Sequence, residues 1–361
     1  SRLEKLRSMF VLTRRKKIWL AILLAILIFF WWSLPRTLFS KPTSYVIEDA
    51  DGNLLNAVIA ADGQWRFPYD ENVPQRFIDC ITTYEDKRFY SHPGVDVIAL
   101  GRAMRSNMFS KAPTQGGSTI SMQVIRLSQN NSRRNIWNKL KESWLAVRLE
   151  CSYSKKEIIA LYASNAPFGS NIVGLDAASW RYYGRSADKL SWGEMATLAV
   201  LPNSPSLVHP GKNRDQLLQK RNRLLDQLLA AKKLSPGDCD LAKQEELPIK
   251  PLPLPQNAPH LLQRFKKENK EGSTRIRSTI DGELQKNVTQ VLSGRQPLLQ
   301  SNGINNICAL VLDVETGNTL AYVGNVFQPA NKEMESDVDV INAPRSPGSA
   351  LKPVLYAAMM S

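Results

Sequence analysis

The chain has 361 residues, 43% of them hydrophobic, and a formal net charge of +14 at pH 7. This length exceeds one ordinary hydrophobic core, so we expect two soluble modules and a tail. Its four cysteines lie far apart without a C-x-x-C pair and its three histidines do not cluster, which argues against a zinc site, a histidine metal site or a disulfide framework.

The N-terminus combines a basic segment with an apolar run. Residues 1–17 hold seven lysines and arginines against one glutamate, and residues 18–34 are apolar without a charge. This run of 17 residues is at the short end for a transmembrane helix, and Trp31 and Trp32 are typical of a membrane interface. The positive-inside rule predicts a cytoplasmic segment 1–17, an uncleaved transmembrane anchor 18–34 and an external remainder. A cleaved signal peptide is the alternative.

The external part carries an excess of positive charge. Binding to nucleic acid does not explain this charge, because a protein outside the membrane rarely meets nucleic acid. Anionic lipid headgroups and a pyrophosphate-bearing substrate would both attract such a charge. We therefore expect membrane lipids among the partners and no nucleic acid.

The next elements are predicted from turn residues and hydrophobic periodicity. Residues 43–60 predict a β-hairpin that turns at Asp51-Gly52. From about 70 to 245 the pattern is helical, with clear segments at 95–109, 118–129, 134–152, 154–164, 191–201 and 213–233. Ser154 and Glu157 predict a capping box at the start of one of these helices.

One predicted helix carries an apolar stripe. In the segment 134–152, apolar residues recur at steps of three or four, at Ile136, Leu140, Trp144, Val147 and Cys151. This spacing predicts one buried face.

A proline-rich stretch separates the helical part from a C-terminal part of different character. Five prolines lie within residues 247–259, so 246–275 is predicted to be a stiff linker. Residues 275–280 and 307–314 then predict strands, and 315–318 predicts a hairpin turn before a further short strand.

Two short segments carry side chains suited to chemistry. Glu85 and Asp86 end a predicted helix, and His92 follows shortly after them. Gly116 to Ile120 is a glycine-hydroxyl turn that opens a helix, where backbone N–H groups can bind an anion. A general base beside an anion site would suit a phosphate-activated substrate. Taken singly, the carboxylates also fit a solvated helix end, and the turn also fits an ordinary N-cap.

Two further pairs of residues have the spacing of functional pairs. Lys139 and Glu142 share one face of a predicted helix, where a surface ion pair is the alternative to a catalytic role. The Ser-x-x-Lys pattern of penicillin-reactive nucleophiles occurs three times, and only Ser349/Lys352 has a Pro-Gly pair before it and a proline after it.

Five segments match the motifs of one family in order and spacing: Glu85–Gly94, Gly116–Gln123, Asn138–Glu142, Ser154–Gly174 and Leu190–Pro205. They resemble the glycosyltransferase domain of class A penicillin-binding proteins, glycosyltransferase family 51. Residues 276–361 resemble the start of the penicillin-binding transpeptidase domain, with Ser349 as nucleophile and Lys352 as base. The S-x-N and K-T-G motifs of that domain do not follow, so we expect no peptide cross-linking by this chain.

The resemblance implies a mainly α, lysozyme-like glycosyltransferase domain at 43–245, with a single N-terminal transmembrane helix and a C-terminal α/β fragment of a transpeptidase domain. It implies polymerisation of lipid II into β-1,4 glycan strands, with inversion at the anomeric carbon and release of undecaprenyl pyrophosphate. The protein would lie in the inner membrane with its catalytic domain in the periplasm. Its expected partners are the growing glycan strand, membrane lipids and other wall-synthesis proteins, and its expected inhibitor is moenomycin.

The resemblance also assigns residue roles. Glu85 would take the proton from the acceptor 4-hydroxyl, and Glu142 would orient Lys139 or help to hold a divalent cation, Mg²⁺ or Mn²⁺, at the pyrophosphate. The residues expected to bind substrate or shape the site are Asp86, Phe89, His92, Gly117, Ser118, Thr119, Gln123, Arg126 and Lys139. Met122 and Ser164 depart from the usual residues of the family, which affects fine substrate contacts more than the reaction.

Two other functions stay open at this point. A non-catalytic scaffold for wall-synthesis complexes would account for the departures at Met122 and Ser164. A lysozyme-like lytic enzyme would also use a lone glutamate. Conversion of lipid II into glycan would indicate the synthase, fragments released from finished wall would indicate the lytic enzyme, and neither activity would indicate the scaffold.

Overall fold

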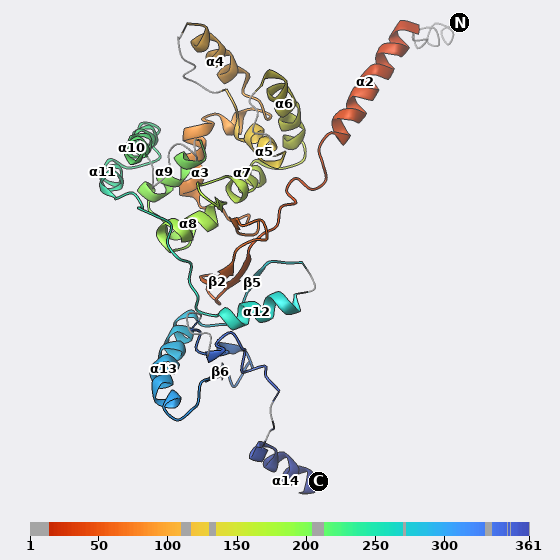
Figure 1. The fold of residues 1–361 in the computed structure, drawn as a ribbon. Coiled ribbons are helices and arrows are strands. Elements are labelled where there is room, and N and C mark those ends of the chain that lie inside the picture. The colour runs from red at the N-terminus through yellow and green to blue at the C-terminus, as the bar shows by residue number, and fades with distance from the viewer. Residues whose placement is uncertain are drawn as a thin grey trace. The chain divides into compact units, whose positions relative to one another are not determined.

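The computed structural model describes residues 14–109, 117–129, 135–203, 213–269, 272–328, 334–344, 346 and 348–360 (Figure 1). The chain divides into two compact units. Unit 1 combines Ser1–Thr43 with Ala60–Leu252, and unit 2 combines Ser44–Ile59 with Pro253–Ser361. Most of the predicted basic segment, together with Gly116, Pro347 and the end of the fifth motif, lies outside the described residues.

α2 (Arg14–Trp32) is the first described helix. It begins with four basic residues and continues with apolar side chains that are mostly exposed. Over the described ranges, no helix is both long enough and apolar enough to cross a membrane. The anchor at 18–34 stays a prediction.

Unit 1 is mainly helical, as the sequence predicts. Its helices after α2 are α3 (Gln75–Glu85), α4 (Val97–Phe109), α5 (Ile120–Ser128), α6 (Ile136–Glu150), α7 (Lys155–Asn165), α8 (Leu175–Tyr183), α9 (Trp192–Val200), α10 (Arg214–Ala230) and α11 (Pro236–Gln244). The six predicted helical segments are confirmed within a few residues as α4, α5, α6, α7, α9 and α10. A short parallel pair joins β3 (Trp65–Arg66) to β4 (Ile172–Val173).

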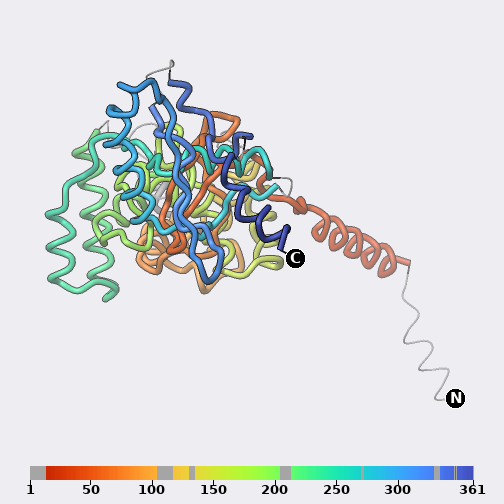
Figure 2. The backbone as a smooth tube through the Cα atoms, turned by 90° about the horizontal axis from the view of Figure 1, so that it is seen from below, coloured from red at the N-terminus to blue at the C-terminus, as the bar shows by residue number. Residues whose placement is uncertain are grey.

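The core of unit 1 is built around α9, which packs against α3, α10 and α11. The side chains of Met195 and Leu198 on α9 are fully buried, as are Phe77 on α3 and Leu225 on α10. Figure 1 and Figure 2 show α10 and α11 lying side by side. On the other side of α3, α5 packs against α6 and α7 and thereby brings together three of the predicted motifs.

Polar side chains start several helices at the predicted residues. The Ser154 hydroxyl accepts from the N–H of Glu157, and the Glu157 carboxylate accepts from the N–H of Ser154 at 2.7 Å, so the predicted capping box is confirmed. Ser191 and Glu194 form a second box at the start of α9. Each box satisfies two backbone N–H groups that the first helical turn leaves without partners.

The predicted buried face of α6 is wrong. Ile136 is 79% exposed, Leu140 57% and Trp144 39%, while the buried residues of α6 are Glu142, Leu145, Ala146, Arg148 and Leu149. The inward face of α6 carries small and aliphatic side chains that pack closely against α5. It also carries two charged residues, Glu142 and Arg148, that form hydrogen bonds. Periodicity locates an apolar stripe, but it does not say whether that stripe faces the core.

Unit 2 begins with the predicted hairpin. β1 (Tyr45–Glu48) pairs antiparallel with β2 (Leu54–Val58), and Gly52 in the turn has a φ of 82° that favours glycine. β1 also pairs in parallel with β5 (Arg275–Arg277), which gives a sheet of order β2-β1-β5. The hairpin therefore groups with the C-terminal part, whereas the sequence places it in the domain 43–245.

The remainder of unit 2 adds further helices and a second hairpin. They are α12 (Pro259–Glu268), α13 (Gly282–Gln300), β6 (Ala309–Leu312), β7 (Thr319–Val323), a 3₁₀ turn at Gly348–Leu351 and α14 (Lys352–Met360). α12 forms within the predicted linker because Pro259 stands at the first turn of the helix, where proline costs no hydrogen bond. α12 packs against the sheet. The core joins residues of both hairpins, of α12 and of the segments just before α12 and α13: Ile47, Leu55, Ala258, Leu262, Ile280 and Tyr322.

Candidate active site

Glu85 is the last residue of α3, and two amide side chains hold its carboxylate. Gln123 of α5 donates from Nε2 to Oε2 at 2.8 Å, and Asn203 donates from Nδ2 to Oε1 at 3.1 Å. The side chain is half-buried. Two neutral donors fix the carboxylate in direction without neutralising its charge, which is the state a general base needs.

Arg126 and Glu142 form a fork-shaped ion pair between α5 and α6. Arg126 Nε lies 3.0 Å from Glu142 Oε1, and Nη2 lies 2.7 Å from Oε2. Nη2 is also 3.5 Å from Ser118 Oγ. The hydrogen bond with Glu142 raises the pKa of Arg126 against the opposing effect of burial, and the charge of Glu85 adds to the rise. Arg126 is thus a fixed cation near two carboxylates.

The sequence predicts that Glu142 orients Lys139, but these two residues do not form an ion pair. Both oxygens of Glu142 accept from Arg126, and within the described residues no ion pair forms at Lys139, which is half-buried on α6. Arg126 prevails because its planar fork matches a carboxylate in two contacts, whereas the ammonium of a lysine is a point charge.

Asp86 and His92 link the first motif to the start of α5. The buried carboxylate of Asp86 lies 3.0 Å from His92 Nε2 and accepts from the N–H of Ile120 at 3.1 Å. Gly94 donates its N–H to His92 Nδ1 at 3.2 Å. Because Nδ1 accepts this bond, the proton sits on Nε2 and points at Asp86. Asp86 and His92 thereby hold the backbone that follows Glu85 against the start of α5.

Thr119 is the N-cap of α5, so the N-cap interpretation of the glycine-hydroxyl turn is confirmed. Its hydroxyl accepts from the N–H of Met122 at 3.2 Å and donates to the carbonyl of Gly94 at 2.6 Å. The N–H groups of Ile120 and Met122 are therefore occupied by Asp86 and Thr119. Any anion at this turn would have to bind donors other than these two N–H groups.

Phe89 is a buried residue of the first motif, between Glu85 and Gly94. It is 1% exposed, and the ammonium of Lys155 stands 4.3 Å from the centre of its ring. Lys155 also donates to the His92 carbonyl at 2.8 Å and to Glu150 Oε1 at 2.7 Å. Sequence reasoning gives Lys155 and Glu150 no role in the site, because an isolated charged residue gives no sign of its partner.

Comparison with known proteins identifies the chain. Residues 51–229 match the Transglycosylase family. Penicillin-binding protein 1C of Escherichia coli (strain K12) is 33% identical over 329 residues, which cover 90% of this chain and 41% of that protein. The chain belongs to the class A penicillin-binding protein family.

Other class A penicillin-binding proteins match shorter or more divergent stretches. Penicillin-binding protein 1A of Haemophilus influenzae is 36% identical over 202 residues, 56% of this chain and 23% of that protein. Penicillin-binding protein 1B of Escherichia coli (strain K12) is 26% identical over 332 residues, 86% of this chain and 38% of that protein. The chain thus spans less than half the length of these relatives.

In this member of the penicillin-binding protein family, every residue of the cluster around Glu85 belongs to the glycosyltransferase domain. Glu85, Gln123, Arg126, Glu142 and Asn203 all fall within the matched residues 51–229. Asn203 lies in the fifth predicted motif, but only the fold shows that it reaches a carboxylate on α3.

Tyr162 of α7 is a further member of this neighbourhood that sequence reasoning misses. Its hydroxyl is buried, and no hydrogen-bond partner for it lies among the described residues. Burial, followed by the charge of Glu85, raises the pKa of Tyr162 well above its ordinary value of 10.0. Its phenol is therefore neutral and cannot act as a base near neutral pH.

The described residues form no cluster of side chains that could hold the divalent cation predicted from the sequence. In the part of the chain that the structure describes, no three His, Cys, Asp or Glu side chains gather in a way that could hold a metal ion. Both oxygens of Glu142 already accept from Arg126. The residues present do not fit a cation held at Glu142, and a cation bound mainly by substrate oxygens stays a prediction.

The predicted transpeptidase pair lies in unit 2. Ser349 is in the 3₁₀ turn Gly348–Leu351, and Lys352 begins α14. Both residues are exposed. Their assignment as nucleophile and base rests on the motif alone.

Proposed function

We propose that unit 1 polymerises lipid II into β-1,4 glycan strands. The observation that carries the proposal is the placement of the Glu85 carboxylate near the Arg126–Glu142 ion pair inside the transglycosylase domain. A base beside a fixed cation is what a reaction with an incoming hydroxyl and a departing diphosphate requires.

In the proposed step, the 4-hydroxyl oxygen of the acceptor sugar bonds to the anomeric carbon of the donor. Its proton passes to Glu85, and the bond from that carbon to the pyrophosphate oxygen breaks. Undecaprenyl pyrophosphate leaves with the electron pair, opposite the attacking oxygen, so an α-linked donor gives a β bond.

The cations of the cluster would stabilise the departing pyrophosphate. Arg126 is held in one orientation by Glu142, so it needs no rearrangement as negative charge develops on the leaving oxygen. Lys139, without an ion pair among the described residues, would supply a second charge. Gln123 and Asn203 would keep Glu85 aimed at the acceptor.

We also propose that α2 attaches the protein to the inner membrane, with unit 1 in the periplasm. Support comes from the basic residues at the start of α2 and from its apolar, exposed remainder. Lipid II, the growing strand and membrane lipids would then be available on one side of the membrane. Moenomycin as inhibitor and other wall-synthesis proteins as partners belong to the same proposal.

Polymerisation of fluorescent lipid II by the full chain in detergent tests the catalytic proposal. Wild-type protein should form long glycan that moenomycin suppresses, and Glu85→Gln should form none while keeping its circular dichroism spectrum. Turnover by Glu85→Gln near that of wild type would refute the assignment of the base. Fragments released from finished wall would instead indicate a lytic enzyme, and neither activity would indicate a scaffold.

A further inference from the structure

A cavity of about 280 Å³ lies in unit 1 away from the cluster around Glu85. Its wall includes Arg36, Lys41, Tyr69, Tyr153 and Asn165, and none of the residues that contact Glu85 or pair with Arg126 lines it. This volume is many times the space that one water molecule requires, which leaves room for a polar group of about ten non-hydrogen atoms, such as glycerophosphate.

The wall of the cavity carries positive charge. Its ionisable lining residues besides tyrosine are Arg36, Lys41 and Arg66, and no acidic side chain lines it. Arg66 is already paired, because its Nη1 lies 2.9 Å from Asp62 Oδ2 and 2.6 Å from the carbonyl of Pro42. Arg36 and Lys41 are exposed, and neither forms an ion pair with any described residue. Two positive charges therefore remain available to a ligand.

The uncharged part of the wall offers hydrogen-bond donors. Within the described ranges, the hydroxyls of Tyr69 and Tyr153 make no hydrogen bond. Desolvation and the charges of Glu71, Glu157 and Asp70 outside the lining raise the pKa of Tyr69, so its hydroxyl keeps its proton and can donate. Two cations and two phenols match a ligand with several negatively charged oxygens, as a phosphate has.

The cavity is close in the chain to the end of α2. Arg36 follows Trp32 by four residues, which span at most about 14 Å when extended. Trp31 is 61% exposed and Trp32 81%, and tryptophan concentrates at the headgroup level of membranes. Charged residues directly after such tryptophans lie where lipid phosphates are found.

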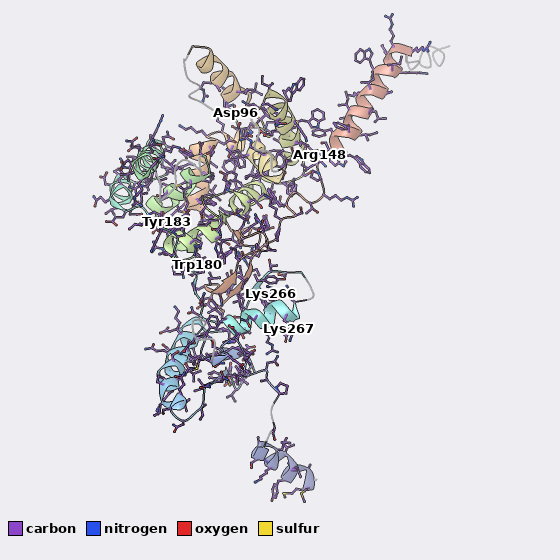
Figure 3. All side chains as sticks on the ribbon, in the orientation of Figure 1. Asp96, Arg148, Trp180, Tyr183, Lys266 and Lys267 are labelled. Atoms are coloured by element: carbon purple, nitrogen blue, oxygen red, sulfur yellow. The ribbon has the colours of Figure 1, made fainter. Side chains whose placement is uncertain are left out.

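Arg148 of α6 fixes the end of α2 against the rest of unit 1. Its Nε and Nη2 donate to the carbonyl of Trp31, each at 3.2 Å, and its guanidinium lies 4.3 Å from the centre of the Trp31 ring. Figure 3 shows Arg148 on α6, on the side where α2 ends. Tyr153 of the cavity wall follows five residues later in the chain. Short stretches of chain thus connect the end of α2, and the Arg148 that contacts it, to the cavity wall.

We propose that this cavity binds the phosphate headgroup of an anionic glycerophospholipid in the outer leaflet of the membrane. Arg36 and Lys41 supply the charge, and the hydroxyls of Tyr69 and Tyr153 supply directed hydrogen bonds. The bound headgroup sets the height of unit 1 above the bilayer. This inference rests on the proposed function only in placing α2 in the membrane.

Lipid binding by the full chain in neutral detergent micelles tests the proposal. Phosphatidylglycerol is the probe, phosphatidylcholine is the comparison, and bound lipid is counted by native mass spectrometry over a titration. Wild type should bind phosphatidylglycerol saturably and at least tenfold more tightly than phosphatidylcholine. The double variant Arg36→Gln/Lys41→Gln should lose at least tenfold in affinity, and Tyr153→Phe should lose several-fold.

The matched control removes the same charge from another part of unit 1. Lys232→Gln/Lys250→Gln loses two exposed lysines outside the cavity wall and should bind phosphatidylglycerol like wild type. Equal affinities of the two double variants would overturn the proposal, because they would reduce it to nonspecific attraction. Soluble glycerol phosphate that competes at the same concentration as the lipid would overturn the lipid as source.

The lipid site and the polymerisation site can fail independently. Glu85→Gln should still bind phosphatidylglycerol with wild-type affinity. The double variant Arg36→Gln/Lys41→Gln should still polymerise lipid II in detergent micelles, where no bilayer sets the height of the domain. Loss of polymerisation in detergent by that variant would contradict a separate lipid site.

Discussion

At the scale of single residues, the candidate site depends on how charges are distributed around Glu85. Its direct partners are the neutral amides of Gln123 and Asn203, so its negative charge is not cancelled by contact. Arg126 instead takes its two closest contacts from Glu142. This division keeps a basic carboxylate and a fixed cation in one site, because a direct ion pair between Glu85 and Arg126 would disable both.

We expect Glu142→Gln to lower polymerisation by at least tenfold, because Arg126 loses the carboxylate that fixes its orientation. We also expect the free energy of unfolding to fall by about 1–3 kcal/mol, since a largely buried guanidinium loses its partner. Turnover of lipid II and urea unfolding measure the two effects.

An exposed ion pair provides the control for Glu142→Gln. Asp226→Asn removes one partner of the Lys243–Asp226 pair, in which the aspartate side chain is 58% exposed, and should change stability by less than about 1 kcal/mol. In the double variant Arg126→Gln/Glu142→Gln, stability should recover in part while activity stays low. Full activity of that variant would show that the pair serves only the fold.

Tyr162→Phe tests a buried hydroxyl that has no partner among the described residues. Removing an unsatisfied hydroxyl that burial separates from water should raise stability by about 1 kcal/mol. Thermal unfolding measures this gain, and lipid II turnover should stay within a factor of two. A large loss of turnover with an unchanged melting temperature would mean that the hydroxyl contacts substrate.

At the scale of elements, the loop of the first motif is tied to its neighbours by one glycine and one aspartate. Gly94 has a φ of 97°, and a Cβ built there would lie 2.6 Å from the carbonyl oxygen of Ala146 on α6. Asp96 lies just before α4 (Figure 3) and accepts from the N–H of Ala99 at 2.7 Å. The loop that follows Glu85 is thereby held between α4, α5 and α6.

Gly94→Ala should cost about 3 kcal/mol or more, because it combines an unfavourable φ with overlap against rigid backbone. Gly63→Ala is the matched control, since Gly63 has a φ of 74° but a Cβ added there would meet no other heavy atom within 4 Å. The control should lose only the conformational term of about 1–2 kcal/mol. Equal losses in urea unfolding would show that contact with α6 is unimportant.

Asp96 should make stability depend on pH in the acid range. Its hydrogen bond and ion pair with Arg88 lower its pKa from 3.8 to about 2, against the opposing effect of burial. The stabilisation is complete above the ordinary value and is lost as the pH falls through about 2. It amounts to about 1–2 kcal/mol, because solvent screens the half-exposed Arg88.

Urea unfolding of Asp96→Asn between pH 2 and pH 6 measures this contribution. The variant should be less stable than wild type at pH 6 by about 1–2 kcal/mol, and the difference should shrink toward pH 2. Asp188→Asn, at an exposed aspartate, should follow the wild-type curve. A constant difference between Asp96→Asn and wild type would mean that the ion pair contributes nothing.

The sequence predicts elements better than it predicts their contacts. Ser154 and the turn at Gly52 act within a few residues of themselves, so the helix start and the hairpin follow from local rules. The direction of the stripe at Leu140, the partner of Glu142 and the reach of Asn203 depend on residues distant in sequence. Motif order still brings Glu85 and Arg126 to one site, because the spacing of a whole family encodes those distant contacts.

At the scale of the whole molecule, the chain passes twice through each of its two units. Residues 44–59 separate two segments of unit 1 in the sequence but belong to unit 2, where β1 forms the middle strand of the sheet. We therefore expect the C-terminal residues alone to lack a complete unit 2, since among the described strands β5 pairs only with β1. A domain boundary drawn only at the proline-rich stretch would divide this sheet.

Ile47→Ala tests this division. Ile47 is 1% exposed in the core of unit 2, so the substitution should cost about 2–4 kcal/mol there. Amide hydrogen exchange should accelerate in α12, α13 and β7, although Ile47 is more than 200 residues away in the chain, while α9 keeps its protection. Leu198→Ala in the core of unit 1 should produce the opposite pattern. Equal acceleration in both units with either variant would show that they unfold as one cooperative body.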